Sequence, residues 1–165
     1  MKEKTTEVTV QGQQWLLRRM TPTTGSYIWQ RLMAAMFEAQ LKMGQAATDA
    51  ENAADAAKDP ETAKAEKEAA EEAAKKIPPE QRLRGMCGIA FMHLSFSDTE
   101  FMQTAAMKVI SRVETLAGVT APMPVMDDSG RYAIEDVAND PFLVTRLTVE
   151  ALVFSLAPFL VESGA

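Results

Sequence analysis

Residues 5–20 read TTEVTVQGQQWLLRRM, and this stretch decides how the chain begins to fold. Two valines alternate with polar residues before Gln11-Gly12, and Trp15 and Leu17 alternate again after it. Alternation with a period of two around a glycine-containing turn is typical of a β-hairpin. Because an isolated hairpin is marginal in water, it must pack on another element. The sequence therefore predicts a hairpin over 5–20 that docks on the rest of the chain.

A long apolar helix is predicted directly after the hairpin, from Pro22 to about Met43, because proline suits the first turn of a helix. Apolar residues at helical spacing form one stripe: Ile28, Leu32, Ala35, Met36, Ala39 and Met43. A second set widens that stripe: Trp29, Met33, Phe37 and Leu41. More than one face is therefore apolar. Such a helix is either central to the core, which we favour, or has a second face for a partner.

Residues 46–76 differ in composition from the rest of the chain. They contain 13 Ala, nine acidic residues and five Lys, and no aromatic or large aliphatic side chain. Ala, Glu and Lys are strong helix formers, yet a helix with nothing larger than Ala gains little from packing. Asp59-Pro60 should interrupt it. We expect an Ala/Glu/Lys-rich insertion that is either helical or disordered and adds nothing to the core.

Two more helices are predicted after this insertion. Pro78-Pro79 opens the first, whose apolar stripe runs to Leu94. Ser97 and Glu100 match a capping box for the second, with Ser97 as the N-cap. Apolar residues at helical spacing then continue, and Gly118 is predicted to end this helix.

The last part of the sequence predicts a turn region and a final helix. Residues 119–133 form a loop, or a short second hairpin that pairs Val125-Met126 with Tyr132. Pro141 begins the final helix at its first position, and Pro158 should kink or end it.

The size and composition indicate one domain over residues 1–165, with 47% apolar residues. We expect a mainly α fold with a small N-terminal β-hairpin (α+β), built like a helical bundle, with residues 46–76 as an insertion. The net charge of -6 argues against a nucleic-acid partner, which needs a concentrated basic surface. A basic membrane-binding face is disfavoured for the same reason.

Other features indicate an intracellular, soluble chain. A single cysteine excludes an intrachain disulfide. The N-terminus shows no apolar stretch of a secretory signal. The longest apolar run, residues 151–161, is short of the ~20 residues that a membrane-spanning helix needs. We therefore expect a cytosolic protein with no membrane partner.

The residues that could carry catalysis have stronger structural interpretations. His93 is the only histidine, and one histidine cannot build a usual metal site. Cys87 lies on the predicted core stripe, where cysteine behaves as a small hydrophobe. Residues 127–130 begin like a calcium loop but lack the glutamate that would complete it, so they predict a turn. We therefore predict that the chain is not an enzyme and has no catalytic residue, no metal site and no cofactor.

The order of elements resembles a known family. The opening V-x-V-x-G-x-x-W-x-L-R-x-M-T-P runs into an apolar helix, and the apolar segment VEALVFSLAPFLVES lies near the C-terminus. This arrangement is similar to the tail assembly chaperones of long-tailed bacteriophages, over residues 7–43 and 139–162. The insertion at 46–76 and the turn at Asp127 have no counterpart in that resemblance.

The resemblance implies a non-catalytic function in the cytoplasm of the host cell. Members of this family coat the tape-measure protein, recruit tail-tube subunits and are absent from the mature virion. The tape-measure protein and the tail-tube protein are the implied partners, and a homo-oligomer is left open. Flexible Met, Leu and Phe side chains suit adaptable apolar contacts of this kind.

The candidates for partner contact come from three parts of the sequence. They are Trp15 in the hairpin, Trp29, Met33 and Phe37 in the first helix, and Phe154 and Phe159 near the C-terminus. The opposing interpretation is that all six belong to the core. Two other functions also fit an acidic chain without catalytic motifs: a structural tail or virion component, and a bacterial secretion-type chaperone or adaptor.

Overall fold

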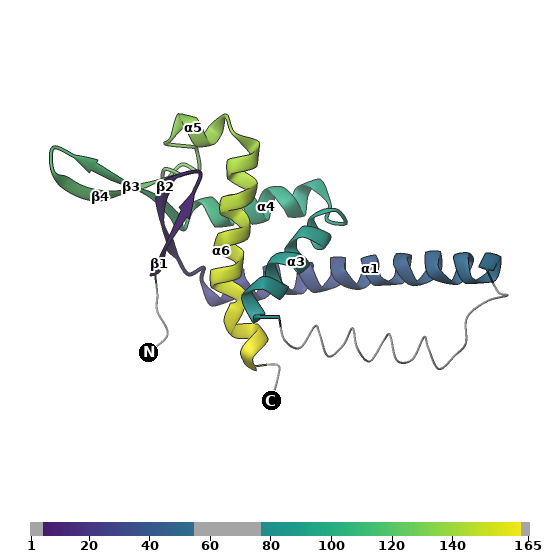
Figure 1. Ribbon diagram of the computed structural model, residues 1–165. Coiled ribbons are helices and arrows are strands. Elements are labelled where there is room, and N and C mark those ends of the chain that lie inside the picture. Colours follow the sequence, from purple (N-terminus) through teal and green to yellow (C-terminus); the bar gives the residue numbers. More distant parts are fainter. Residues whose placement is uncertain (1–4, 55–76, 163–165) are drawn as a thin grey trace.

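The computed structural model describes residues 5–54 and 77–162 of the 165-residue chain (Figure 1). In chain order the elements are β1 (Thr5–Val10), β2 (Gln13–Arg18), α1 (Pro22–Ala54), α3 (Pro79–Phe91), α4 (Phe96–Met107), β3 (Ile110–Leu116), β4 (Val119–Pro124), α5 (Glu135–Ala138) and α6 (Pro141–Glu162). Helices combine with one antiparallel sheet, so the α+β class is confirmed.

Strands β1 and β2 form the predicted hairpin and pair antiparallel along their whole length. The loop residues Gln11 and Gly12 have φ angles of 52° and 76°. Positive φ at both loop positions matches the twist of the strands, and glycine adopts it at no steric cost. Alternation then turns Val10, Trp15 and Leu17 toward the core, where all three are buried.

A second hairpin, β3–β4, replaces the later part of the helix that was expected to end at Gly118. Helix α4 stops at Met107, and Ala117 and Gly118 form a tight turn with φ angles of 51° and 82°. Helical spacing of apolar residues fitted this stretch, but residues 109–115 are rich in β-branched side chains, which favour strands. The expectation was wrong because β3 finds a tertiary partner, the open edge of β2.

The sheet has the order β1-β2-β3-β4 (Figure 1). Leu17 of β2 pairs with Ile110 of β3, so that edge of the hairpin is covered and β1 remains at the edge of the sheet. Beyond β4, Met126 bridges to Tyr132, as the second-hairpin alternative predicted. The connecting turn closes with a hydrogen bond from the Gly130 N–H to the Asp127 carbonyl, 3.0 Å.

Helix α1 begins as predicted and runs further than predicted, to Ala54. The hydroxyl of Thr21 accepts a hydrogen bond from the Thr24 N–H at 3.3 Å, which caps the helix start next to Pro22. The first residues of the 46–76 segment thus continue α1, while residues 55–76, including Asp59-Pro60, lie outside the described residues.

Helix α3 begins after Pro78, as predicted, but α4 begins two residues earlier than expected. Its N-cap is Ser95 and not Ser97, since the Asp98 N–H donates to the Ser95 hydroxyl oxygen at 3.1 Å. Each serine is followed three positions later by an acidic residue, so the sequence offered two equivalent capping boxes. The earlier start brings Asp98 within 3.4 Å of Arg31 on α1.

Helix α6 contacts α3, α4 and the β1–β2 hairpin and forms the centre of the fold (Figure 1). Its buried residues cover a wide arc of the helix: Leu143, Val144, Leu147, Thr148, Ala151, Leu152, Val153, Ser155 and Leu156. A wide buried arc is typical of a central helix, and the exposed residues lie mainly in its first turns. Its start is as predicted, with Pro141 first and the Asp140 carboxylate accepting the Phe142 and Leu143 N–H groups, both at 2.9 Å.

Of the two effects expected of Pro158, an end to the helix is wrong, because α6 continues through it to Glu162. A proline removes one backbone hydrogen bond, and here it does so within the last turns of the helix. The span from Pro141 to Pro158 is long and apolar enough to cross a membrane by length and composition, and 44% of it is buried inside the structure. Core helices pass the same test, and α6 occupies that position here.

Candidate protein-binding surface

Helix α1 carries two apolar faces, of which only one is used by the core. On the inner face Ile28, Leu32, Ala35 and Ala39 are buried. Opposite them lie Met33, Phe37 and Leu41, spaced four residues apart and 41%, 63% and 52% exposed. We call these three residues the α1 outer face. The sequence predicted both sets of residues but could not say which one the body covers.

The outer face continues onto a projecting part of α1. Ala39 is the last buried residue of the helix whose side chain is described, and residues 40–45 are all exposed. Figure 1 shows α1 extending well past α3 and away from the body. An ion pair between Glu38 and Lys42, 2.7 Å apart at i,i+4 spacing, supports this exposed stretch, and the bond from Lys42 lowers the pKa of Glu38.

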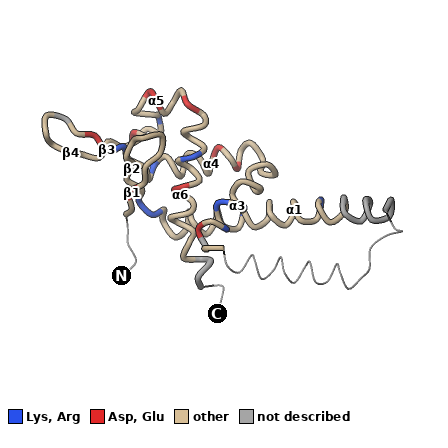
Figure 2. Tube along the Cα trace, viewed as in Figure 1, with Lys and Arg blue, Asp and Glu red and all other residues tan. Residues whose placement is uncertain are grey.

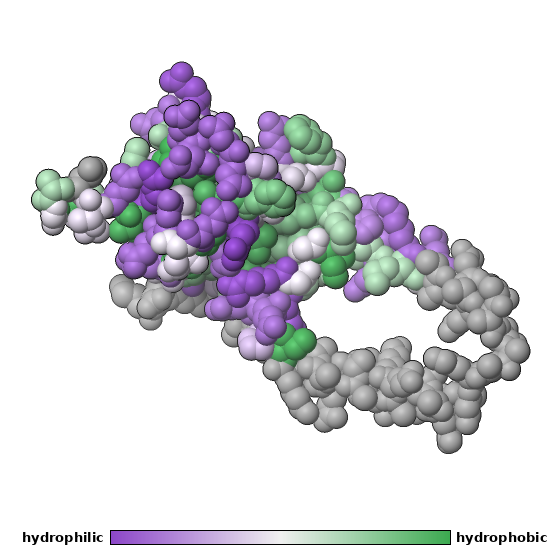
Figure 3. Space-filling model, turned by 45° about the horizontal axis from the view of Figure 1, so that its top comes forward, coloured by the Kyte–Doolittle hydropathy of each residue, from purple (hydrophilic) through white to green (hydrophobic). Residues whose placement is uncertain are grey.

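Figure 3 shows hydrophobic residues gathered where α1 leaves the body. Met43 adds a 65% exposed side chain on the projecting stretch. Exposed apolar side chains grouped on one face commonly mark a protein–protein contact, whereas scattered ones need no explanation. The α1 outer face is therefore the surface on which we base the functional argument.

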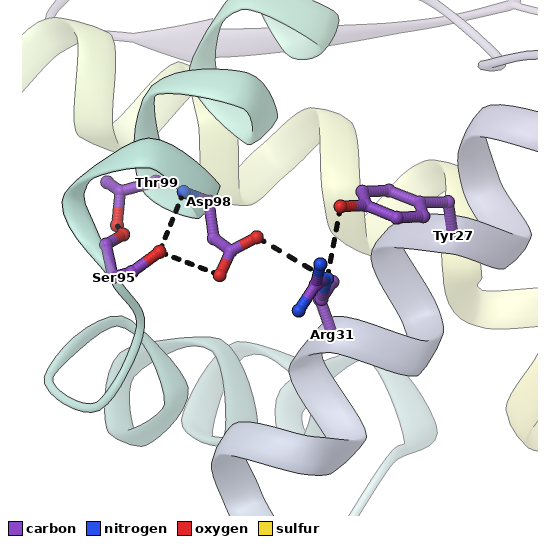
Figure 4. Close-up of polar contacts among 5 residues, drawn as sticks. All are labelled: Tyr27, Arg31, Ser95, Asp98 and Thr99. Atoms are coloured by element: carbon purple, nitrogen blue, oxygen red, sulfur yellow. Dashed lines mark hydrogen bonds and ion pairs between the residues drawn. The ribbon is translucent and has the colours of Figure 1, made fainter.

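A polar cluster links α1 to α4 (Figure 4). The Arg31 guanidinium donates to the Tyr27 hydroxyl at 3.1 Å and lies 3.4 Å from the Asp98 carboxylate. The Ser95 hydroxyl in turn donates to that carboxylate at 2.7 Å, within the cap of α4. Exposed ion pairs contribute little energy, so this cluster adds only a local link between α1 and α4. The direction in which α1 leaves the body depends mainly on its packing against α3.

The structure divides the six candidates for partner contact. Met33 and Phe37 are exposed on the α1 outer face. Trp15 is 0% exposed and its indole N–H donates to the Val10 carbonyl at 3.3 Å, so it belongs to the core and not to a contact surface. The hairpin face that carries it is covered by α6, a tertiary contact that the sequence alone did not reveal.

The other three candidates are less accessible or are not described. Trp29 is half-buried and packs against the core. Phe154 also packs there, and the guanidinium of Arg19 lies 5.0 Å from its ring centroid. The side chain of Phe159 lies outside the described residues.

The two most exposed phenylalanines of the described chain were not among the candidates. Phe96 is 83% exposed at the start of α4, and Phe142 is 79% exposed at the start of α6. Each follows closely on the capping residue of its helix, Ser95 or Asp140, where a side chain points away from the core. Both stand apart from the α1 outer face along the chain.

Cys87 and His93, the two residues considered for catalysis, lie in different environments. Cys87 is 0% exposed, and burial raises the pKa of its thiol to about 12, so it stays protonated and unreactive at neutral pH. His93 lines a hollow of about 240 Å³ between α1 and α4, together with Glu38 and Asp98, and Cys87 is not part of that lining. Across residues 5–54 and 77–162, no three His, Cys, Asp or Glu side chains group so as to hold a metal ion.

Charged residues are distributed without a dominant basic element, as Figure 2 shows for the described part of the chain. Several cations are tied to carboxylates, for example Arg84 to Glu150 at 2.6 Å between α3 and α6. The available surface chemistry is therefore apolar contact and local charge pairing. Comparisons with protein-family models, with curated proteins and with solved structures gave no significant match.

Proposed function

We propose that the protein is a non-catalytic tail assembly chaperone of a long-tailed bacteriophage, which binds the tape-measure protein in the host cytoplasm and recruits tail-tube subunits. The observation that carries this proposal is the α1 outer face, Met33, Phe37 and Leu41, held out on a projecting helix. A long helical partner presents a repeating apolar stripe, and an exposed helix with apolar residues four apart can pack along it.

The resemblance over residues 7–43 supports the same proposal. That region folds as a hairpin followed by α1, and α1 is the element with the unused apolar face. Methionine on this face is flexible and adapts to partners that vary along their length. A reversible chaperone also needs modest affinity, which a small apolar face can supply.

The test is co-expression with a candidate tape-measure protein, followed by a pull-down through a tag on the proposed chaperone. Phe37→Ser removes the largest side chain of the outer face. Phe142→Ser is the matched control, because Phe142 is an even more exposed phenylalanine on α6. Truncation of a central interface residue costs about 2 kcal/mol or more, so Phe37→Ser should weaken binding by about 30-fold. The control should bind like the unaltered chain.

Three results would count against the proposal. The tape-measure protein could fail to co-purify, or both variants could weaken binding equally. The protein could also be found in purified mature particles, which would favour a structural virion component. A chaperone should be missing from those particles, so analysis of their protein content separates the two functions.

A further inference from the structure

A hollow of about 350 Å³ opens between the start of α1 and helix α4, and we call it the α4 hollow. Met20, Ala105 and Val109 contribute apolar surface to its lining, and each also packs in or against the core. Phe101 forms one wall and Lys108 lies at the end of α4. No residue of the α1 outer face lines it. The hollow is therefore a separate surface, with an apolar interior.

The aromatic wall of the hollow is held in place before anything binds. The rings of Phe101 and Tyr27 meet edge to face, with centroids 5.0 Å apart and planes at 77°. Phe101 nevertheless keeps 43% of its surface exposed. The ion pair of Arg31 with Asp98 lies beside this contact and holds the same two helices. A preformed wall lowers the ordering cost of binding.

Two unpaired cations stand beside the hollow. Lys108 lines it and also lines a neighbouring hollow of about 660 Å³, to which Arg18 contributes. Five other described cations lie within ion-pair distance of a carboxylate: Arg31, Lys42, Arg84, Arg112 and Arg131. Arg19, Arg82 and Arg146 have no such partner among the described residues, but none of these three lines either hollow. Neither Arg18 nor Lys108 has such a partner among the described residues, and no acidic residue lines the α4 hollow.

Acidic residues also line the larger hollow. Asp127 and Asp128 contribute to the same lining as Arg18 and Lys108. Asp127 is already engaged by the Ser129 hydroxyl at 2.6 Å and the Arg131 N–H at 2.9 Å. A polyanion that spread across both hollows would meet these carboxylates.

We propose that the α4 hollow binds an acidic segment of another protein, which inserts one aliphatic or methionine side chain and places a carboxylate against Lys108 and Arg18. The apolar lining accepts the inserted aliphatic or methionine side chain, and the two cations attract the carboxylate. Ligand sites measure about 300–1,000 Å³, so a hollow of this size holds one or two side chains.

The test uses a short fluorescein-labelled peptide of Leu, Ala and Glu, with matched peptides in which Lys replaces Glu or Ser replaces Leu. Fluorescence anisotropy measures binding to the full chain, and methyl NMR follows Met20, Ala105 and Val109. The acidic peptide should bind and shift these methyl signals. Lys108→Glu should weaken binding roughly three- to tenfold through loss and reversal of one surface charge. Arg146→Glu is the matched control, because Arg146 is exposed on α6 and outside the hollow, and it should change binding by less than about twofold.

Filling the hollow provides an independent variant. Ala105→Phe should abolish the methyl shifts caused by the peptide, and an unchanged circular dichroism spectrum shows that the variant folds. The proposal is overturned if acidic and basic peptides bind alike, or if the methyl signals do not move. It is also overturned if a short oligonucleotide binds in a Lys108-dependent manner while the peptide does not. None of these measurements involves the tape-measure protein or Phe37, so the result is independent of the proposed function.

Discussion

Replacing one residue on each face of α1 tests whether only the inner face supports the fold. Leu32 is 1% exposed and packs in the core, whereas Phe37, five residues later, is 63% exposed. The two substitutions Leu32→Ala and Phe37→Ala leave the same side chain on the same helix. The difference between their effects therefore reports mainly burial, because helix propensity differs by only about 0.5 kcal/mol.

The expected magnitudes follow from the exposed fractions. A fully buried leucine replaced by alanine costs about 2–5 kcal/mol, including the cavity left behind. A buried phenylalanine removes about 200 Å² from water, so the one-third of Phe37 that is covered amounts to roughly 70 Å² and at most about 2 kcal/mol. Alanine keeps part of that contact and is the better helix former by roughly 0.5 kcal/mol, which leaves about 1 kcal/mol for Phe37→Ala.

Urea and thermal unfolding, followed by circular dichroism at several protein concentrations, measure both changes. For a domain of this size Leu32→Ala should lower Tm by roughly 5–15 °C, and Phe37→Ala by less than about 4 °C. Equal losses of stability in Leu32→Ala and Phe37→Ala, at every protein concentration, would refute the assignment of the two faces. A loss for Phe37→Ala that grows with concentration would show that a second copy covers the outer face.

Three further predictions concern single groups. Gly118→Ala should cost about 1 kcal/mol in urea unfolding, because φ at this position is 82° and a side chain is strained there. Cys87, whose thiol pKa burial raises to about 12, should react with a thiol reagent only after unfolding, and its contribution to stability should be present below pH 9.0 and decline as pH rises from there toward 12. The hydrogen bonds from Leu143 and Gln11 lower the pKa of Asp140, so its stabilising effect should be present above its ordinary pKa of 3.8 and be lost as pH falls below it. Asp140→Asn keeps a capping side chain but removes the titrating carboxyl group. Between neutral and acidic pH, the free energy of unfolding should therefore fall more steeply with pH for the unaltered chain than for this variant.

The local elements could be predicted where neighbouring residues alone decide the structure. The turn at Gln11-Gly12 needs positive φ, which glycine supplies. Pro22 and Pro141 mark helix starts because proline is well suited to the first turn. Elements whose residues fit two structures could not be predicted. Residues 109–115 satisfy both helical spacing and strand propensity, and pairing with β2 decides between them.

The candidate surface shows the same division. The sequence identified Met33 and Phe37 as a second apolar face of α1, and their helical spacing was sufficient for that. It also placed Trp15 among the candidates, since a tryptophan in a hairpin is equally able to face a partner or a core. Only the packing of α6 against the β1–β2 hairpin assigned Trp15 to the interior.

By itself, then, the sequence determined the N-terminal hairpin, the starts of the main helices and the presence of two apolar faces on α1. These depend on backbone conformation and on side-chain period, which are local properties. Tertiary structure decided the β3–β4 hairpin, which α1 face is left open and where Lys108 meets an apolar hollow. Each of those depends on which distant segments come into contact, and burial and charge pairing between such segments are not properties of any one stretch of sequence.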